Sequence, residues 1–295
     1  MQLLEGKSVA EEYLRRLRPR LAVPGRPPCL AFLRVGDNPA SLLYVNRKKS
    51  LAESLGMRAL ERQLPLDAPE GEIFSQLARW NGDPAVDGIL VQAPLPGAEL
   101  QERAFAAVDP LKDVDGFHPR NQGLLALDRP GGFVPCTALA ILHLLRAHGI
   151  GLAGQHAVII GRSTIVGRPL ALLLQGRRVN ATVTVCHRQS RDLAALCRSA
   201  DVLIAAAGSA HLVGPDWVRD GAVVVDVGQN VLSLPGGGRR LVGDVDFAAI
   251  APRCRAITPV PGGVGPMTVA MLMGNVLRAW ELARGMAVDS IPQSY

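Results

Sequence analysis

Helical and strand-like hydrophobic patterns alternate along almost the whole chain, and this alternation restricts the possible folds more than any other feature. Short apolar stretches at residues 29–35, 88–92, 156–161, 182–187 and 202–206 have the length of buried strands. Segments with helical periodicity separate these stretches. Strands that alternate with helices are typical of parallel sheets covered by helices, so the sequence predicts a layered α/β protein.

The length of 295 residues fits two domains. In the second half, strands and helices follow one another as in a nucleotide-binding βαβ series, which predicts a Rossmann-type domain. The first half is a shorter α/β pattern that ends in a long polar loop at residues 109–132, and loops of that length are usually functional. A Gly-rich turn is predicted at residues 235–238. Residues 261–266 are too rich in proline and glycine for a helix interior, so the last helix is predicted over residues 268–284.

The composition excludes several classes of protein. With 48% hydrophobic and 20% charged residues the chain is globular, and none of its apolar runs approaches the ~18 residues of a membrane helix. The amino-terminal segment alternates charge with leucine and lacks the apolar core of a secretory signal, so we expect a cytoplasmic protein. The cysteines are scattered, which favours small buried apolar residues over disulfides or a metal site.

The net charge of +6 indicates anionic partners, and a basic nucleic-acid-binding module is one alternative. Such a module is expected to show a contiguous basic face and stacking aromatic residues. Here aromatic residues make up only 4% of the chain and the basic residues are dispersed, so small anionic ligands are favoured over nucleic acid. The basic residues are 28 arginines and four lysines, which makes a lysine a candidate for chemistry that needs a titratable amine.

A glycine-containing turn follows the strand at residues 156–161. Gly161 and Gly167 allow a tight turn and close approach of a phosphate, and the helix that begins there supplies N–H donors. The turn is not a complete G-x-G-x-x-G pattern, so an ordinary strand–helix turn stays an alternative. The next strand ends without the acidic residue that holds the ribose of NAD, whereas Arg162 and Arg188 could clamp the 2′-phosphate of NADP. NADP is therefore the expected cofactor.

A second group of polar residues belongs to the first half of the chain. Ser41, Tyr44 and Lys48 are spaced three and four apart and therefore share one helix face. A half-buried tyrosine and a solvated lysine would explain that spacing without any chemistry. Gln92 ends an apolar strand, at the edge where open α/β sheets bind ligands.

Two aspartates of the long loop, Asp113 and Asp115, are further candidates. A carboxylate at Asp115 can accept two N–H bonds from a planar heterocycle, although a turn residue before Gly116 is the plainer interpretation. Asp113 fits that turn role better. The histidines are not paired with a Ser or Cys nucleophile, so a hydrolytic triad has little support.

A series of short motifs runs over nearly the whole chain. They are Val35-Gly-Asp-Asn-Pro-Ala-Ser-x-x-Tyr44-Val-x-x-Lys48, Asp87-Gly-Ile-Leu-Val-Gln-x-Pro-Leu-Pro96, Lys112-Asp-Val-Asp-Gly-Phe117, Pro135-Cys-Thr137, Gly161-Arg-Ser-x-Ile-Val-Gly-x-Pro169, Asp226-Val-Gly228, Val242-Gly-Asp-Val245 and Thr258-Pro-Val-Pro-Gly-Gly-Val-Gly-Pro-Met-Thr268. In this order they resemble the bifunctional methylenetetrahydrofolate dehydrogenase/methenyltetrahydrofolate cyclohydrolase family. Small departures are Ala138, where the family often has proline, and Gln229, where an apolar residue is usual.

The resemblance implies a two-domain α/β protein with a cleft between the domains. An N-terminal folate-binding catalytic domain would comprise residues 1–138 together with a returning C-terminal helix at residues 268–295. A Rossmann-type NADP-binding domain would comprise residues 139–267. The partners implied are tetrahydrofolate derivatives and a second copy of the chain in a homodimer, with no nucleic acid, membrane or metal.

The resemblance also implies a chemistry. NADP+ takes a hydride from 5,10-methylenetetrahydrofolate, and water then attacks the methenyl cation to give 10-formyltetrahydrofolate. The catalytic residues would be Lys48, Tyr44, Gln92 and Asp115. Tyr44 would stack on the folate rings, Asp115 would hold the pterin, and Gln92 would fix the Lys48 amine for proton transfer during hydration.

The remaining site residues follow from the same resemblance. The substrate-binding residues would be Tyr44, Ser41, Gln92, Pro94, Asp115, Gly262 and Pro266. The cofactor-binding residues would be Thr137, Gly161, Arg162, Ser163, Ile165, Val166, Gly167, Arg188, Ser190, Gly208, Gly228, Asn230 and Asp244. Another two-domain Rossmann oxidoreductase, such as a shikimate dehydrogenase-like enzyme, is the alternative among enzymes. It would not need the set of Tyr44, Lys48, Gln92 and Asp115.

Overall fold

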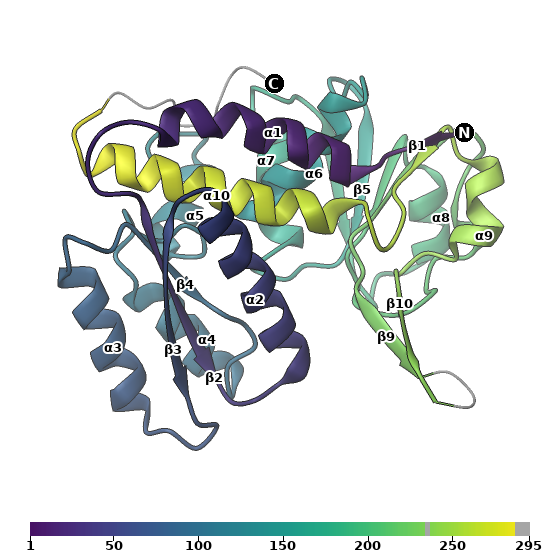
Figure 1. The fold of residues 1–295 in the computed structure, drawn as a ribbon. Coiled ribbons are helices and arrows are strands. Elements are labelled where there is room, and N and C mark those ends of the chain that lie inside the picture. Colours follow the sequence, from purple (N-terminus) through teal and green to yellow (C-terminus); the bar gives the residue numbers. More distant parts are fainter. Residues whose placement is uncertain (234–236, 287–295) are drawn as a thin grey trace. The chain divides into compact units, whose positions relative to one another are not determined.

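The computed structural model describes residues 1–233 and 237–286, and it describes residues 39–41 and 43 by their backbone alone (Figure 1). The chain forms two compact units. The first, here called the six-stranded unit, comprises Met1–Glu12 and Thr137–Ala270. The second, the three-stranded unit, comprises Tyr13–Cys136 and the stretch that starts at Met271.

The six-stranded unit is built on one fully parallel sheet. Its strand order is β1 (Gln2–Leu3), β11 (Ala256–Ile257), β8 (Val223–Asp226), β7 (Val202–Ala205), β5 (His156–Ile160) and β6 (Thr182–Cys186). The helices along this stretch are α6 (Cys136–Ala147), α7 (Gly167–Gln175), α8 (Leu193–Arg198) and α9 (Phe247–Ile250), with short 3-10 turns at Pro215–Trp217 and Ala251–Arg253. The chain order of the strands reverses between β5 and β7, which is where open α/β sheets bind their ligands.

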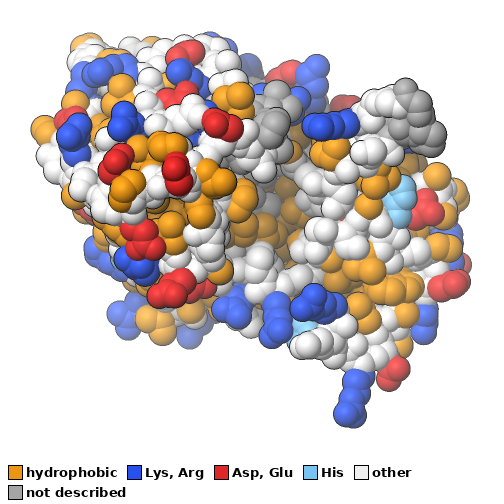
Figure 2. Space-filling model, turned by 90° about the horizontal axis from the view of Figure 1, so that it is seen from below, with side chains coloured by type: hydrophobic (Ala, Val, Ile, Leu, Met, Phe, Trp, Pro, Cys, Tyr) orange, Lys and Arg blue, Asp and Glu red, His pale blue; other side chains and the backbone are white. Residues whose placement is uncertain are grey.

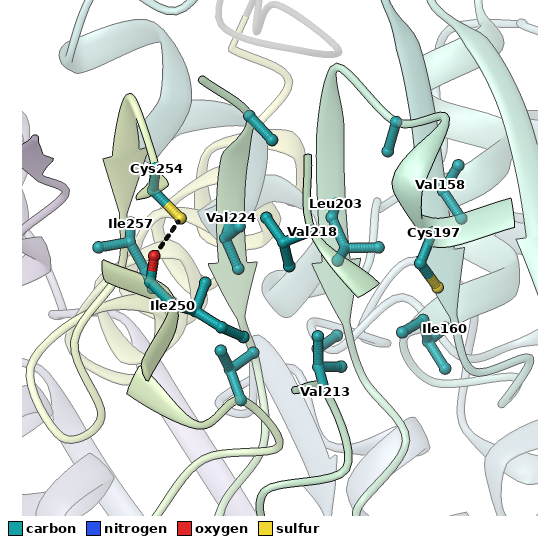
Figure 3. Close-up of a cluster of buried hydrophobic side chains, with 14 of the residues drawn as sticks. Val158, Ile160, Cys197, Leu203, Val213, Val218, Val224, Ile250, Cys254 and Ile257 are labelled. Atoms are coloured by element: carbon teal, nitrogen blue, oxygen red, sulfur yellow. Dashed lines mark hydrogen bonds between the residues drawn. The ribbon is translucent and has the colours of Figure 1, made fainter. Parts of the chain in front are cut away.

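One face of this sheet is covered by a continuous apolar cluster (Figure 3). Strand residues such as Val158, Leu203 and Val224 pack there against residues of the helices and connecting segments, including Cys197 and Ile250. The cluster also contains Cys254, whose thiol donates a hydrogen bond to the Ile250 carbonyl over 3.3 Å. All five cysteines are buried and free, which confirms the interpretation of them as small core residues.

The three-stranded unit has the parallel strand order β3 (Arg58–Leu64), β2 (Cys29–Val35) and β4 (Gly88–Val91). The helices that accompany it are α2 (Pro39–Ser54), α3 (Glu70–Gly82), α4 (Ala98–Ala107) and α5 (Pro119–Ala126) (Figure 1). Every residue of the central strand β2 is buried, because a central parallel strand is covered on both faces, and every residue of the edge strand β4 is buried as well. The α/β class expected from the alternating pattern is confirmed, and among the described residues no helix is long and apolar enough to cross a membrane.

The long polar loop is more ordered than its sequence indicated. It contains the helix α5, and its earlier part joins the sheet edge where Asp113 pairs with Ile89. The Asp113 carboxylate accepts hydrogen bonds from the main-chain N–H groups of Phe117 (3.1 Å) and His118 (2.8 Å) and from the amide of Asn121 (2.8 Å). Asp113 therefore has the turn role that its position before a glycine-containing bend predicted.

The last helix begins earlier than the sequence indicated. Helix α10 (Val264–Leu282) includes Gly265 and Pro266, although proline and glycine content had placed residues 261–266 before it. Pro266 is the third helical residue, where a main-chain N–H has no partner within the helix, so its missing N–H removes no helical bond. The part of the predicted returning helix at residues 287–295 lies outside the described residues.

The amino-terminal segment is a second difference. Gln2 and Leu3 pair with Ala256 and Ile257, so Met1–Glu12 belongs to the six-stranded unit rather than with the rest of residues 1–138. A two-residue strand has no periodicity to detect, and its place depends entirely on its partner strand.

An antiparallel pair is the third difference. Strands β9 (Asn230–Ser233) and β10 (Arg239–Val242) pair outside the main sheet, where the sequence indicated only a Gly-rich turn at residues 235–238. That turn falls partly on residues that lie outside the described ones.

The buried carboxyl group of Asp113 predicts a pH dependence of stability. Burial raises the pKa of Asp113 to about 6, and the three N–H donors oppose this. The folded chain therefore binds this proton more tightly than the unfolded chain, for which the ordinary value is 3.8. The resulting stabilisation is complete below pH ~4 and is lost as the pH rises through about 6.

Replacement by asparagine removes this titration. Between pH 4 and pH 7, the free energy of unfolding of the parent should fall by up to about 3 kcal/mol relative to that of Asp113→Asn. Urea unfolding at several pH values measures the difference, and Asp67→Asn at an exposed position is the control. Parallel pH profiles for the parent and Asp113→Asn would contradict the assignment.

Candidate functional site

A lysine–glutamine pair lies at the carboxyl end of the three-stranded sheet. Helix α2 carries Lys48, whose ammonium group donates a hydrogen bond to Oε1 of Gln92 over 3.1 Å. Gln92 follows β4 directly, and its main-chain N–H continues the sheet by donating to the Leu33 carbonyl at 2.8 Å. Its side-chain NH2 donates to the Ala93 carbonyl at 2.8 Å, which leaves Oε1 facing the lysine. The amide therefore holds the Lys48 amine in one position.

Asp115 lies close to the same amine. Burial raises the pKa of Asp115, while the Lys48 charge and the Cys136 thiol act in the opposite direction. Cys136 donates a hydrogen bond to the Val114 carbonyl at 3.3 Å, and burial raises the pKa of this thiol well above its usual value. From α10, the Asn275 amide donates to the same Val114 carbonyl at 2.8 Å. The turn that carries Asp115 is thus held from two sides.

Tyr44 lies one helical turn before Lys48 on α2, and its ring is half-buried. Burial raises the pKa of the Tyr44 hydroxyl, with Arg47 acting in the opposite direction. Pro94 is exposed just after Gln92. The backbone of Ser41 belongs to α2, but its side chain lies outside the described residues. The predicted group of Lys48, Gln92 and Asp115 is therefore brought together, with a tyrosine ring beside it on the helix.

The six-stranded unit carries a separate arrangement at the carboxyl ends of its central strands. Gly161 follows β5 with φ of +123°, and a Cβ atom there would overlap the Ala206 carbonyl at the end of β7. A Cβ atom on Gly167, the first residue of α7, would overlap the Gly161 carbonyl. The two glycines let strand, turn and helix approach one another more closely than any side chain would permit.

Two arginines lie at this same edge of the sheet. Strands β5 and β6 are paired neighbours whose last residues, Ile160 and Cys186, are opposite each other. Arg162 and Arg188 each follow their strand by two residues, and both side chains are exposed. Guanidinium groups in such positions can bind a phosphate on the adenosine ribose of a dinucleotide.

The remaining predicted cofactor residues lie around the same edge. Ser163 accepts a hydrogen bond from the Val166 N–H at 3.2 Å and so shapes the turn, with Ile165 half-buried inside it. Ser190 accepts a hydrogen bond from the His187 N–H at 3.0 Å. Other residues of that predicted set are Thr137 at the start of α6, Gly208 after β7, and Gly228 and Asn230 after β8. Gly262, just before α10, and Pro266, in its first turn, are predicted to bind substrate.

Asp244 differs from the other predicted cofactor residues because it is fully buried. Its carboxylate accepts hydrogen bonds from main-chain N–H groups of the turn after β7 and from the Asn230 amide. All of its oxygen contacts are thus within the protein, so the structure supports a role in shaping the turn rather than a contact of its own with a ligand.

Sequence reasoning left out three residues of these sites. Cys136 was assigned only a core role, Asn275 carried no signal at all, and Asp226 stood in a motif without a function. Cys136 and Asp226 could have been found from their place in the motif series. Asn275 could not, because its contact with the Val114 carbonyl joins segments far apart in the sequence.

Charged side chains of both signs lie on the face of the molecule drawn in Figure 2, where acidic groups stand beside many of the Lys and Arg side chains. Among the described residues, no cluster of three or more His, Cys, Asp or Glu side chains could hold a metal ion.

A parallel sheet with a glycine turn at its switch point, together with a lysine site in a second α/β unit, defines a two-domain dehydrogenase of the Rossmann type. The model of the tetrahydrofolate dehydrogenase/cyclohydrolase catalytic domain matches residues 4–115, and that of the corresponding NAD(P)-binding domain matches residues 135–284. The chain belongs to the tetrahydrofolate dehydrogenase/cyclohydrolase family.

Relatives and solved structures agree with this membership. The chain is 50% identical to the bifunctional protein FolD of Treponema pallidum over 97% of this chain and 92% of that protein. It is 47% identical to the FolD protein of Sorangium cellulosum, covering 95% and 97% of the two chains. Among solved structures, the Trypanosoma brucei methylenetetrahydrofolate dehydrogenase–cyclohydrolase, a complex with NADP and an inhibitor, is similar with a TM-score of 0.91. That likeness covers 96% of this chain and 98% of the other, at 36% identity.

The shikimate dehydrogenase-like alternative is explained by a shared fold. The shikimate 5-dehydrogenase of Thermus thermophilus is similar with a TM-score of 0.54 over 88% of this chain and 95% of the other, at 21% identity. At that identity the likeness concerns the fold alone. The family models, which match both parts of the chain, separate the two classes of enzyme.

The close approach of Gly161 to β7 gives a second prediction. Gly161→Ala should reduce both the free energy of unfolding and the affinity for NADP+, because the new Cβ atom forces the turn away from Ala206. Gly154→Ala is the matched control: Gly154 also has a positive φ, +74°, but open space where the Cβ atom would lie. In Gly154→Ala the free energy of unfolding should fall by only the ~1–2 kcal/mol that a left-handed backbone conformation costs.

Urea unfolding and titration with NADP+ measure the two effects. Gly161→Ala should cost more stability than the control and should alone weaken cofactor binding. Equal effects of the two substitutions on both measurements would show that the turn does not depend on this contact.

Proposed function

We propose that the chain oxidises 5,10-methylenetetrahydrofolate to 5,10-methenyltetrahydrofolate with NADP+ and hydrolyses the product to 10-formyltetrahydrofolate. Membership of the dehydrogenase/cyclohydrolase family supports both activities. The structural observation that carries the proposal is the Lys48–Gln92 hydrogen bond of 3.1 Å with Asp115 beside it. A positioned amine next to a carboxylate suits a substrate that has both a heterocycle to hold and a proton to move.

The residues of the three-stranded unit divide this work. Asp115 accepts N–H bonds from the pterin and anchors it, since a carboxylate can accept two parallel bonds from a planar ring. The Tyr44 ring stacks on the folate ring system. Gln92 holds the Lys48 amine at the one-carbon bridge, and Lys48 moves the proton when water adds to the methenyl carbon. Ser41 and Pro94 complete the substrate-binding set.

The residues of the six-stranded unit fit a dinucleotide. Gly161 and Gly167 let β5, the turn and α7 pack closely, and the N-terminal N–H groups of α7 can bind phosphates. When bound, NADP+ supplies the acceptor for the hydride that leaves the one-carbon bridge. Arg162 and Arg188 select NADP by binding its 2′-phosphate, and the Trypanosoma brucei relative, described as a complex with NADP, supports that choice.

A homodimer, a cytoplasmic location and the absence of nucleic-acid partners remain part of the proposal. The predicted functional division also belongs to the proposal: residues 1–138 and the returning helix bind folate and residues 139–267 bind NADP, although Met1–Glu12 packs with the six-stranded unit. The main assay is the spectrophotometric appearance of methenyltetrahydrofolate from methylenetetrahydrofolate, first with NADP+ and then with NAD+. No product with either coenzyme would contradict the proposal.

Lys48 provides a test of the hydrolytic step. Lys48→Arg keeps the positive charge but cannot act as a base, and Lys48→Met removes the amine. Both variants should lose ~10²–10⁴-fold in the hydrolysis of methenyltetrahydrofolate, because that step needs a positioned proton carrier. The dehydrogenase rate should fall less, since hydride transfer needs alignment and no such proton.

The neighbouring lysine is the matched control. Nζ of Lys49 lies 3.6 Å from Oε2 of Glu61 on β3, and Lys49→Arg should leave both rates within about two-fold. The decay of methenyltetrahydrofolate, corrected for the uncatalysed reaction, measures hydrolysis. If Lys48→Arg hydrolysed as fast as the parent, Lys48 would act through its charge alone.

Coenzyme choice gives the other prediction for this function. Replacing Arg162 and Arg188 together by alanine should erode the preference for NADP+ over NAD+ at least about ten-fold, because each charged hydrogen bond contributes ~1.5–3 kcal/mol. The ratio of kcat/KM values for the two coenzymes is the measurement. Arg168→Ala, an exposed position on α7, is the control. An unchanged ratio in the double variant would remove both arginines from the 2′-phosphate site.

A further inference from the structure

We propose that two buried carboxylates position the turn at residues 207–209 for the dinucleotide. The Asp226 carboxylate holds the backbone of Asp244, and the Asp244 carboxylate holds the turn; this pair of contacts is here called the relay. Neither side chain needs to touch the cofactor in this role, so both are positioning residues. The inference rests on the proposed NADP-dependent function, and it assigns a task to Asp226, which had none.

The first half of the relay is the contact of Asp244 with the turn after β7. Asp244 is 0% exposed. Its Oδ2 accepts hydrogen bonds from the N–H groups of Ala207 (2.6 Å) and Gly208 (2.9 Å), and its Oδ1 accepts from that of Ser209 (2.8 Å). The Asn230 amide adds a fourth bond, to Oδ1, at 2.8 Å. Three consecutive main-chain N–H groups therefore converge on one carboxylate, which fixes the conformation of the turn.

The second half is the contact of Asp226 with the segment that carries Asp244. Asp226 ends β8, and its Oδ1 accepts from the N–H groups of Gly228 and Asp244, both at 2.9 Å. Its Oδ2 accepts from the Val245 N–H at 3.0 Å. The main-chain N–H of Asp226 is itself bonded to the Thr258 hydroxyl at 2.7 Å. Asp226 thus links the Asp244 backbone to a strand of the sheet.

Close packing shows that the relay is built into the backbone. A Cβ atom on Gly228 would overlap both the carboxylate and the main-chain nitrogen of Asp244. Any side chain at position 228 would push Asp244 away from the turn. The glycine of the Asp226-Val-Gly228 motif is therefore required by Asp244, independently of any contact that it makes with a ligand.

The position of the turn explains why its conformation matters. It follows β7, the strand next to β5 at the point where strand order reverses. Gly161, at the start of the phosphate turn, approaches Ala206 so closely that no Cβ atom fits between them. A shift of residues 207–209 would therefore move one wall of the place where a dinucleotide binds. The turn is exposed on its outer side and held by Asp244 on its inner side.

The test compares Asp244→Asn with the matched control Asp246→Asn. In the first variant one oxygen is replaced by an NH2 group that faces N–H donors, so the turn loses acceptors. Asp246 lies two residues away, and its carboxylate accepts a capping hydrogen bond at the N-terminus of α9, from the Ala249 N–H at 3.3 Å. KM for NADP+ in the dehydrogenase reaction should rise at least about ten-fold in Asp244→Asn and less than about two-fold in the control.

Comparing KM for NADP+ with kcat distinguishes a positioning role of Asp244 from a loss of overall structure. In Asp244→Asn, kcat at saturating NADP+ and the cofactor-free hydrolysis of methenyltetrahydrofolate should fall far less than the affinity for NADP+. Parallel losses of all three would indicate a structural defect and overturn the inference. An unchanged KM for NADP+ would overturn it as well.

A second measurement covers the case in which Asp244→Asn does not fold. In the parent, the amide hydrogens of Gly208 and Ser209 should exchange slowly although their turn is exposed, because Asp244 holds them. Asn230→Ala, which removes one of the four bonds, should speed that exchange. Fast exchange in the parent would overturn the inference. A parent with no NADP+-dependent oxidation would instead contradict the proposed function, and the exchange result would still stand by itself.

Discussion

Buried aspartates that accept main-chain N–H bonds hold together the loops on which both sites depend. At the carboxyl ends of parallel strands the chain must leave the sheet, and its N–H groups lose their strand partners. Asp113, Asp226 and Asp244 satisfy such groups in three different loops. An ionised carboxylate binds several donors at once and more strongly than a neutral acceptor, which explains why aspartate recurs in this role.

The two sites are made in different ways because they bind different things. The Lys48 site uses side chains from a helix, a strand end and a loop, since it must present a titratable amine and a carboxylate to a heterocycle. The β5–α7 turn depends instead on two glycines that let its main chain pack closely, because phosphates bind to main-chain N–H groups at the start of a helix. Charge enters there only through the exposed arginines Arg162 and Arg188 at the rim.

The scarcity of lysine was a weaker signal than it appeared in the sequence. Lys112 is another of the four lysines, yet its ammonium donates hydrogen bonds to the carbonyls of Trp80 (2.9 Å) and Asp83 (2.7 Å) near the end of α3. Burial lowers the pKa of Lys112, but its contacts are those of a helix C-terminal cap. Lys48 instead faces a glutamine whose other bond fixes its direction. Geometry, and not rarity, distinguishes the two lysines.

The sequence by itself determined the α/β class and the family, and it proposed the site residues, because all of these follow from local patterns: hydrophobic periodicity, glycines after strands and short motifs. It also separated Asp113 from Asp115, since a turn role follows from local chain chemistry. The tertiary structure alone decided that Gln2 and Leu3 join the sheet of the six-stranded unit, that Asn275 holds the Asp115 turn, and that Asp244 faces inward to residues 207–209. Each of these depends on contacts between segments far apart in the chain, and no local pattern contains the identity of a distant partner.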